Sequence, residues 1–400
     1  MTAASGCDLL LFLPSLRGGG AERALVGVAN ALADGGARVT LVLARAEGPY
    51  LTEVRDTVTI VDLALDRVSR CVGALSSAIV RWRPRSVMSA MRHANAVLVV
   101  AQRLARLRGV SSRLVLSERG HMGAYLATGQ PARVQWATRI GGLLYRRADA
   151  IVAVSDDLAA ALRVELGKGA PRIEAIANPT ITPELLAQAH EPAPHPWLGD
   201  PAVPVVVAAG RMTSEKGFDV LIDAFARVAA VRPARLILLG AGPLRDALAT
   251  QAQALGVSDL VHFPGFATNL GAWLARAQLF VLSSRAEGLP NVLIQAMALG
   301  VPVVATDCPT GPAEILDRGR WGSLVPVDDV PALASAMMAT LAIPPAAVPD
   351  AVLERFHPVP VAARYAEVLG IPFVRPSARI ERSPMPDGSA SAPSSLAEVA

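Results

Sequence analysis

The sequence predicts an α/β protein with two doubly wound domains whose mostly parallel sheets face a cleft. Three observations support this class. Short apolar runs alternate with helical segments through the first half of the chain, which is the pattern of repeated βαβ units. A Pro-rich segment at residues 190–204 interrupts the pattern, and the same alternation then starts again. The chain has 400 residues, of which 52% are hydrophobic, and this is enough for two buried cores.

The first domain is expected to cover residues 1–190. Its predicted strands are residues 8–14, 39–44, 58–63, 86–90, 114–117 and 150–154. A Gly-rich turn separates the first strand from a helix at residues 21–32, and two glycines at 35 and 36 end that helix. A helix near residues 356–370 is expected to cross back and complete this domain.

The second domain is expected to cover residues 200–355. Its predicted strands are residues 203–209, 236–239, 260–263, 279–283, 301–305 and 323–326. Residues 375–400 are polar and low in aromatic residues, so a disordered tail is expected there.

Cysteine usage and hydropathy indicate the cytoplasm. Cys7, Cys71 and Cys308 are odd in number and lack the spacing of a metal site, which fits a reducing compartment. The N-terminus has no charged stretch before its short apolar run, so no signal peptide is expected. No apolar stretch is long enough to predict a membrane span.

Positive charge is concentrated in the first domain. Between Arg67 and Arg147 the chain has fifteen arginines and a single acid, Glu118. Such a block indicates an anionic partner, either an anionic membrane surface or a phosphate-bearing acceptor. Nucleic acid is disfavoured, because aromatic residues are sparse and no recognition motif is present. An Arg-rich composition on a solvated face explains the block almost as well.

A glycine-rich turn, RGGGA at residues 17–21, follows the first predicted strand and leads into a helix. Glycines let backbone N–H groups approach a ligand closely, and the helix dipole favours an anion at this position. The turn lacks the Gly-Lys-Ser/Thr sequence of a nucleotide-binding P-loop. It is therefore either another kind of phosphate-binding loop or a plain tight turn.

Two basic residues follow the first strand of the second domain. Arg211 and Lys216 lie in the segment GRMTSEK at residues 210–216, and the only other lysine in the chain is Lys168. Arginine offers a planar fork to a phosphate and lysine offers a point charge, so the pair is predicted to clamp a phosphate group. The alternative is a solvated surface pair.

The most informative stretch is SSRAEGLPNVLIQAMALG at residues 283–300. It places Glu287 between a buried strand and the start of a helix, where α/β folds bind anionic ligands. Glycine turns at residues 240–243 and 263–266 also follow strands but are weaker signals. In the second of these turns, Gly265 is expected to help present backbone groups to a base ring.

The order of these motifs resembles the retaining family-4 glycosyltransferases of the GT-B fold, over roughly residues 9–369. The segment DCPTGP at 307–312 is similar to a bacterial subgroup that builds surface polysaccharide and lipid-linked oligosaccharide. The resemblance implies a nucleotide diphospho-sugar donor, usually a UDP-sugar, and a glycan or polyprenyl-diphosphate-linked acceptor. It also implies retention at the anomeric carbon and no obligatory metal, and the chain has no Asp-x-Asp motif.

The resemblance further implies roles for individual residues. Arg211 and Lys216 would hold the donor diphosphate, while Gly19 and Gly20 would close over the phosphate or the acceptor from the other domain. Glu287 would contact the donor sugar or its departing face. The backbone of the turn that follows would approach the sugar and the phosphate at Gly288, Leu289, Pro290 and Asn291.

The chain departs from the family pattern at residue 295. The pattern has a second Glu there, whereas Gln295 can still bind a ribose diol but carries no charge. His121 is a second catalytic candidate, in a loop where family members often carry a polar residue that faces the sugar. A solvated loop histidine is an equal alternative. Glu118 and Arg119 could form a local ion pair or meet an acceptor phosphate.

Two other interpretations stay open. A nucleotide-sugar epimerase can share this fold, although residues 287–295 argue against it. A non-catalytic nucleotide-sugar-binding protein fits the neutral Gln295 but not the intact Arg211, Lys216 and Glu287. Residues 94–107 form an expected amphipathic helix with arginines near its end, so a peripheral position on the inner face of the plasma membrane is also predicted.

Overall fold

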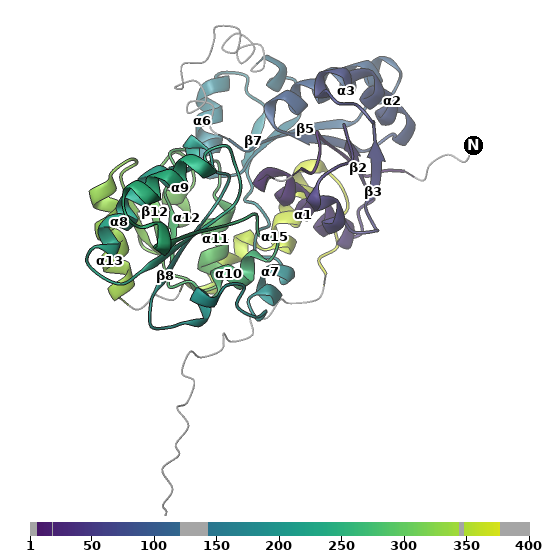
Figure 1. Ribbon diagram of the computed structural model, residues 1–400. Helices are drawn as coiled ribbons and strands as arrows, with labels where there is room; N and C mark the ends of the chain where they lie inside the picture. Colours follow the sequence, from purple (N-terminus) through teal and green to yellow (C-terminus); the bar gives the residue numbers. More distant parts are fainter. Residues whose placement is uncertain (1–5, 18, 121–142, 344–347, 377–400) are drawn as a thin grey trace, which may run out of the picture.

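The computed structural model describes residues 6–17, 19–120, 143–343 and 348–376. It contains two parallel sheets, each covered by helices, in two domains that lie side by side (Figure 1). The predicted α/β class with two doubly wound domains is therefore confirmed. Apart from its first two residues, the predicted tail at 375–400 lies outside the described residues, and within those residues no helix is long and apolar enough to cross a bilayer.

The first domain has a seven-stranded sheet in which all neighbouring strands are parallel. In spatial order its strands are β3 (Thr59–Asp62), β2 (Val39–Leu43), β1 (Leu9–Leu13), β4 (Ser86–Ala90), β5 (Arg113–Glu118), β6 (Ala150–Ala153) and β7 (Arg172–Ala175). Strands β1 and β2 are buried at every position, which explains their continuous apolar runs. The strand β7 was not predicted, because only one of its four residues is fully buried and its sequence, RIEA, is half charged.

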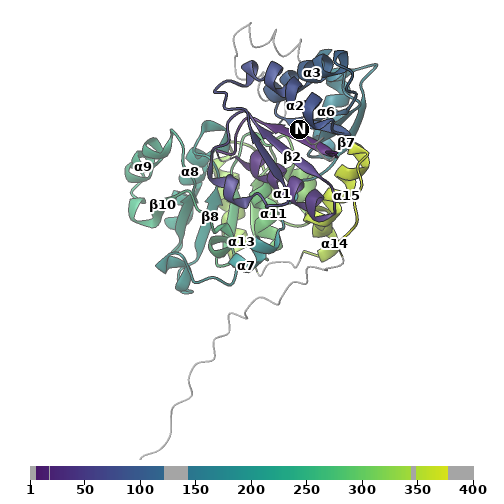
Figure 2. The same cartoon turned by 90° about the vertical axis from the view of Figure 1, so that its right-hand side faces the viewer.

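Helices on both faces of this sheet complete the first domain. They are α1 (Gly20–Asp34), α2 (Val72–Trp82), α3 (Arg92–Leu107), α6 (Asp156–Leu166) and α15 (Pro358–Leu369). Although α15 follows the whole second domain in the chain, it lies beside α1 (Figures 1 and 2). Its Tyr365 is fully buried in the first-domain core, and the carbonyl of Val368 accepts a 2.7 Å hydrogen bond from Arg113 Nε.

The second domain has a six-stranded parallel sheet, and its six strands lie where the sequence predicts them. In spatial order they are β10 (Val261–Gly265), β9 (Arg235–Leu239), β8 (Val205–Ala209), β11 (Leu279–Leu282), β12 (Val303–Thr306) and β13 (Ser323–Val325). The helices are α8 (Phe218–Ala229), α9 (Arg245–Ala254), α10 (Leu270–Leu274), α11 (Asn291–Ala298), α12 (Pro312–Ile315) and α13 (Val330–Ala342). Because β8 and β11 are neighbours, the segments after them emerge at the same edge of the sheet.

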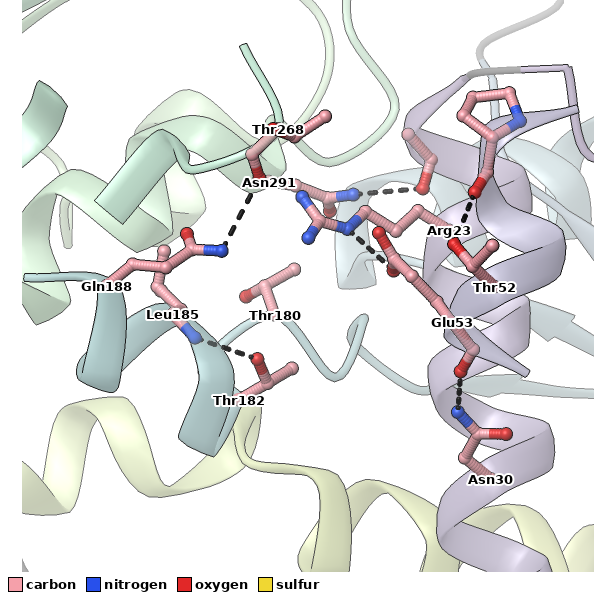
Figure 3. A network of polar contacts seen from close by, with 12 residues as sticks. Arg23, Asn30, Thr52, Glu53, Thr180, Thr182, Leu185, Gln188, Thr268 and Asn291 are labelled. Atoms are coloured by element: carbon pink, nitrogen blue, oxygen red, sulfur yellow. Dashed lines mark hydrogen bonds and ion pairs between the residues drawn. The ribbon is translucent and has the colours of Figure 1, made fainter. Parts of the chain in front are cut away.

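The chain first crosses between the domains just before α7 (Pro183–Gln188), earlier than predicted. The helix α7 packs against α10 of the second domain. The Gln188 side chain accepts from the N–H of Gly271 at 3.1 Å and donates to the carbonyl of Thr268 (Figure 3). The Pro-rich segment expected to be the linker therefore follows a helix that already lies on the second domain.

The chain crosses back through a 3-10 turn (Glu354–Phe356) that leads into α15. The carbonyl of Phe356 accepts hydrogen bonds from the N–H groups of Thr180 and Ile181, at 3.0 and 3.2 Å. The two crossings are thus bonded to each other, and together they form the narrow connection between the domains.

Candidate functional site

A cavity of about 660 Å³ lies between the two domains, at the carboxyl ends of their strands. Most of the residues proposed from the sequence line it, from both sides: Gly19, Gly20, Arg211, Lys216, Glu287, Gly288, Leu289, Pro290, Asn291 and Gln295. Gly265 does not line the cavity, although its neighbour Phe266 does. His121 lies outside the described residues.

The centre of the site is an ion pair between Lys216 and Glu287. Lys216 Nζ lies 2.5 Å from Glu287 Oε1, and Ser284 Oγ donates to the same oxygen at 2.7 Å. The side chain of Glu287 is 10% exposed and that of Lys216 is 25% exposed, so water screens the pair only weakly. The sequence indicated both residues but not their contact, which arises because each follows the end of one of two neighbouring strands.

A second ion-pair group holds the two loops that carry Lys216 and Glu287. Arg285 donates to both carboxylate oxygens of Asp219, at 3.0 and 2.7 Å, and to Asp328 at 2.7 Å. Burial raises the pKa of Asp219, but the hydrogen bonds from Arg285 outweigh that effect and leave the pKa below its usual value. Arg285 was not singled out from the sequence, where it is one arginine among many.

Gly217 allows these two loops to pack closely. Its φ of +59° lies in the left-handed region, and a Cβ atom there would lie 2.1 Å from the carbonyl oxygen of Ser283. Only glycine therefore fits between Lys216 and the end of β11 without moving the backbone.

The turn after Glu287 is braced by the segment DCPTGP that the sequence also indicated. Thr310 N donates to the carbonyl of Glu287 at 2.9 Å, and Thr310 Oγ1 donates to the carbonyl of Gly288 at 3.0 Å. Cys308 lies beneath this turn, where burial and then the charge of Glu287 raise the pKa of its thiol to about 12. A raised pKa favours the protonated thiol over the nucleophilic thiolate.

The same turn also contacts the first domain. Asn291 Nδ2 donates to the carbonyl of Gly20 at the start of α1, at 3.1 Å (Figure 3). Asn291 Oδ1 accepts from Asn178 Nδ2 at 2.6 Å, in the first crossing. A Cβ on Gly288 would lie 1.9 Å from the carbonyl oxygen of Arg119, so a glycine is needed where the two backbones meet.

Gln295 lies one turn further along α11, at the inner edge of the cavity. Its side chain is buried, and its amide donates to the carbonyl of Thr180 at 3.4 Å. A carboxylate has no proton to donate to this carbonyl at neutral pH. The Glu of the family pattern could not form this hydrogen bond to Thr180, and the sequence alone could not show this.

The basic residues of the cavity differ in how their charge is balanced. Arg17 pairs with Glu47 at 2.7 Å, and Arg23 pairs with Glu53 at 3.1 Å on the flank of α1 (Figure 3). Arg211 is exposed and forms no ion pair within the described part of the chain. The proposed phosphate-binding arginine of the second domain is thus open to an anionic ligand.

Glu118 does not pair with the side chain of Arg119, so that alternative from the sequence is wrong. Its carboxylate lies 3.1 Å from Arg92 Nε and accepts from Tyr145 OH at 2.7 Å. Burial raises the pKa of Glu118, and Arg92 lowers it in part. Among the residues described, no group of three or more His, Cys, Asp or Glu side chains could hold a metal ion.

Family models match the chain in two places. A model described as Glycosyltransferase Family 4 matches residues 18–182, and one described as Glycosyl transferases group 1 matches residues 203–342. Similar relatives include the lipopolysaccharide core biosynthesis glycosyltransferase LpsE of Rhizobium meliloti, 29% identical over 80% of this chain and 84% of LpsE. An exopolysaccharide phosphotransferase of Streptomyces coelicolor is 36% identical, but the match covers 47% of this chain and only 19% of that protein.

Solved structures show a similar fold. HepE of Anabaena in complex with UDP-glucose superposes with a TM-score of 0.73 at 22% identity, over 91% of this chain and 99% of HepE. WaaG, a glycosyltransferase involved in lipopolysaccharide biosynthesis, superposes with a TM-score of 0.62 at 16% identity, over 91% of this chain and 97% of WaaG. At these identities the likeness concerns the fold, and it confirms the predicted two-domain class.

Proposed function

Because the chain belongs to the glycosyltransferases, with a family-4 domain followed by a group-1 domain, we propose that it transfers a sugar from a nucleotide diphospho-sugar with retention at the anomeric carbon. The donor we propose is a UDP-sugar, and the acceptor is a glycan or a polyprenyl-diphosphate-linked glycan. The observation that carries the proposal is the Lys216–Glu287 pair beside the open Arg211, at the centre of a cavity between two domains.

The donor diphosphate is proposed to bind between Arg211 and Lys216. One N–H of the Lys216 ammonium is used by Glu287, so two remain for phosphate oxygens. As the bond to the sugar breaks, negative charge grows on the leaving diphosphate, and fixed positive groups stabilise that charge. We propose that Glu287, which accepts a hydrogen bond from Ser284, contacts the sugar.

The nucleoside is proposed to extend along α11 and β10. Gln295 faces the cavity and offers an amide to the ribose hydroxyls, while Phe266, 55% exposed, offers an aromatic face to the base beside Gly265. A UDP-sugar is the favoured donor because HepE, with a similar fold, has been solved with UDP-glucose. His121 stays a catalytic candidate from the first domain.

We propose that the first domain, which would hold the acceptor, docks on an anionic membrane through the end of α3. A second cavity of about 720 Å³ there is lined by arginines that include Arg103, Arg106 and Arg147, and these three form no ion pair with any described residue. On the same helix Leu104 and Leu107 are 40% and 85% exposed. Apolar side chains next to unpaired arginines suit the surface of an anionic bilayer.

A donor screen tests the enzymatic proposal. The purified chain is incubated with a panel of UDP- and GDP-sugars, and donor hydrolysis and binding are followed by mass spectrometry. We expect slow hydrolysis of a UDP-sugar, unchanged by EDTA because no metal is required. If no nucleotide sugar is bound or hydrolysed, the proposed function is wrong; loss of activity with EDTA contradicts the metal-free mechanism alone.

Vesicle flotation tests the membrane proposal separately. The wild-type protein is expected to float with vesicles that contain phosphatidylglycerol and not with phosphatidylcholine alone. The double variant Arg103→Glu and Arg106→Glu should lose this binding. The matched control, Arg227→Glu with Arg232→Glu on the second domain, changes the net charge equally and should still float. Equal flotation of both variants would contradict docking through α3.

A further inference from the structure

Arg119 is an arginine in the cavity that forms no ion pair with a carboxylate of the described residues. It follows β5 in the first domain and lines the cavity. Its guanidinium donates to Asn178 Oδ1 and, at 3.2 Å, to the hydroxyl of Tyr365, and both of these acceptors are neutral. Its Nε atom is fully enclosed and has no hydrogen-bond partner in the described chain.

The neighbouring carboxylates do not pair with Arg119. Glu22, at the start of α1, acts on Arg119 through its charge but forms no ion pair with it. Glu118, the adjacent acid, is held by Arg92 and Tyr145 and meets Arg119 only through the backbone N–H. Residues 121–142, which follow directly, contain no Asp or Glu. Burial lowers the pKa of Arg119, and the nearby Tyr365, Glu22 and Glu118 offset this only in part.

An enclosed cation without an ion-pair partner is costly, and a bound anion would supply that partner. The cavity offers a direct comparison. Arg17, Arg23 and Lys216 each have a carboxylate partner, whereas Arg119 and Arg211 do not. The two arginines without an ion-pair partner come from opposite domains, as an anion held between the domains would require.

The surroundings of Arg119 indicate which anion this is. Asn178, its partner, bonds to Asn291, and Asn291 bonds to the carbonyl of Gly20. The carbonyl of Arg119 itself lies against Gly288, next to Glu287. Arg119 therefore stands between the start of α1 and the turn at which the proposed function places the donor sugar and its phosphate.

We propose that Arg119 binds the distal phosphate of the nucleotide diphosphate from the first domain, opposite Arg211. The proposal rests on the function given above. Asn178 and Tyr365 hold the guanidinium in place. A diphosphate that contacts both domains would form the ion pair that Arg119 lacks.

The test compares the affinities of full-length variants for UDP and UMP, and for GDP and GMP, by isothermal titration calorimetry. Wild-type protein is expected to prefer the diphosphate of one pair. Arg119→Gln should weaken diphosphate binding about ten- to a hundredfold, the effect of losing charge-assisted hydrogen bonds. It should leave monophosphate binding unchanged. Arg119→Lys keeps the charge and should restore part of the preference.

Two controls separate ligand binding from a structural role. Tyr365→Phe removes one hydrogen bond that holds the Arg119 guanidinium but leaves its charge, so it should keep a preference for the diphosphate that is smaller than in the wild type and larger than in Arg119→Gln. Arg23→Gln removes a cavity arginine that already has a partner, and it should also keep the preference. If Arg119→Gln folds and keeps the wild-type preference, or if it weakens both nucleotides equally, Arg119 is a structural residue and the inference is wrong.

The result also separates this inference from the proposed function. If wild-type protein binds neither nucleotide pair, the proposed function fails and the inference fails with it. If wild-type protein prefers a diphosphate and Arg119→Lys and Arg119→Gln behave like the wild type, the function stands and only the role of Arg119 is overturned.

Discussion

Lys216 and Glu287 form a single contact that joins the two strand-end loops of the second domain. Because both side chains are largely enclosed, each one sets the environment of the other. A bound diphosphate would add negative charge beside Lys216, so the ammonium would then serve two anionic groups at once. In the proposed function this pair links the group that contacts the sugar to the group that binds the leaving diphosphate.

Replacing Lys216 by Ala removes the ammonium and leaves Glu287 enclosed without its partner. We expect kcat/KM for the donor to fall about 10²- to 10³-fold, the range seen when one charge-stabilising donor is lost. Steady-state kinetics with the donor found in the screen measures this. The matched control is Lys168→Ala, which removes the other lysine of the chain from an exposed position and should have no effect. Wild-type turnover in Lys216→Ala would rule out the proposed phosphate clamp.

Replacing Gln295 by Glu restores the family pattern but removes the proton donated to the carbonyl of Thr180. We expect the KM for the donor to change more than kcat, because we propose that the residue contacts the ribose and not the reacting bond. The free energy of unfolding should fall by about 1–3 kcal/mol, the cost of a buried acceptor left without its donor. Urea denaturation and donor kinetics measure the two effects. A large change in kcat at constant KM would contradict a ribose contact.

The sequence placed Arg211, Lys216 and Glu287 in loops that follow strands, where α/β folds bind ligands. Arg285 lies in the same loop as Glu287, but its role depends on contacts with Asp219 and Asp328 that the sequence does not show. The role of Thr310 likewise depends on its contact with Gly288. The balance of charge around Arg119 depends in the same way on which carboxylates the fold brings near, and the sequence does not show this.

At the level of elements, the strands with continuous apolar runs were predicted and the irregular segments were not. All six strands of the second domain agree with the sequence pattern, whereas β7 is an edge strand with mixed exposure and no apolar run. The first crossing was misplaced because prolines mark a break in regular structure but do not show which domain the neighbouring helix packs against. The packing of α7 on α10 decides that, and it is a tertiary effect.

The turn between β11 and α11 provides a test of contact between elements. Gly288→Ala puts a methyl group into the carbonyl of Arg119 and should hold the two domains apart. We expect at least a tenfold loss of donor turnover with little change in the melting temperature, since each domain keeps its own core.

The matched control for that variant is Gly300→Ala, at the end of α11. Gly300 has a φ of +73° and open space around it, so alanine there is strained without touching the other domain. We expect a loss of about 1–2 kcal/mol in the free energy of unfolding and normal turnover. Equal losses of turnover in both variants would show that the effect of Gly288→Ala is not specific to the domain contact.

At the level of the whole molecule, the domains meet at a second place away from the crossings. Glu314 of α12 accepts from the N–H groups of Asp156 and Asp157, at 2.8 and 3.5 Å, at the start of α6 in the first domain. Arg355 lies 3.6 Å from the same carboxylate. One side chain of the second domain thus caps a helix of the first, and this contact helps to hold the two domains together.

Glu314→Ala removes this cap and should let the domains separate. We expect a larger radius of gyration in small-angle X-ray scattering of the ligand-free protein. The control, Glu314→Gln, keeps an oxygen that can accept from the same N–H groups and should match the wild type. An unchanged radius in Glu314→Ala would show that the crossings and the contacts of the turn between β11 and α11 set the arrangement of the domains.

The carboxylate of Glu314 predicts that the free energy of unfolding depends on pH. Burial raises the pKa of Glu314, although the hydrogen bond from Asp156 lowers it in part. From pH 4.5 up to the raised pKa, the folded protein holds a proton that the unfolded chain has lost, so stability falls as pH rises through this window. Urea denaturation at a series of pH values measures the slope, and Glu314→Gln should make it shallower. An equal slope in that variant would assign the effect to other groups.

The position of α15 determines the order in which the two domains can mature on the ribosome. The second-domain sheet is contiguous from β8 to β13, so it can assemble as soon as it has emerged. The first-domain core includes Tyr365 and Leu369, which are synthesised only afterwards. The domain that is made first is therefore completed last, and until α15 arrives the nascent chain presents the uncovered apolar face of α1 to the chaperones of the cell.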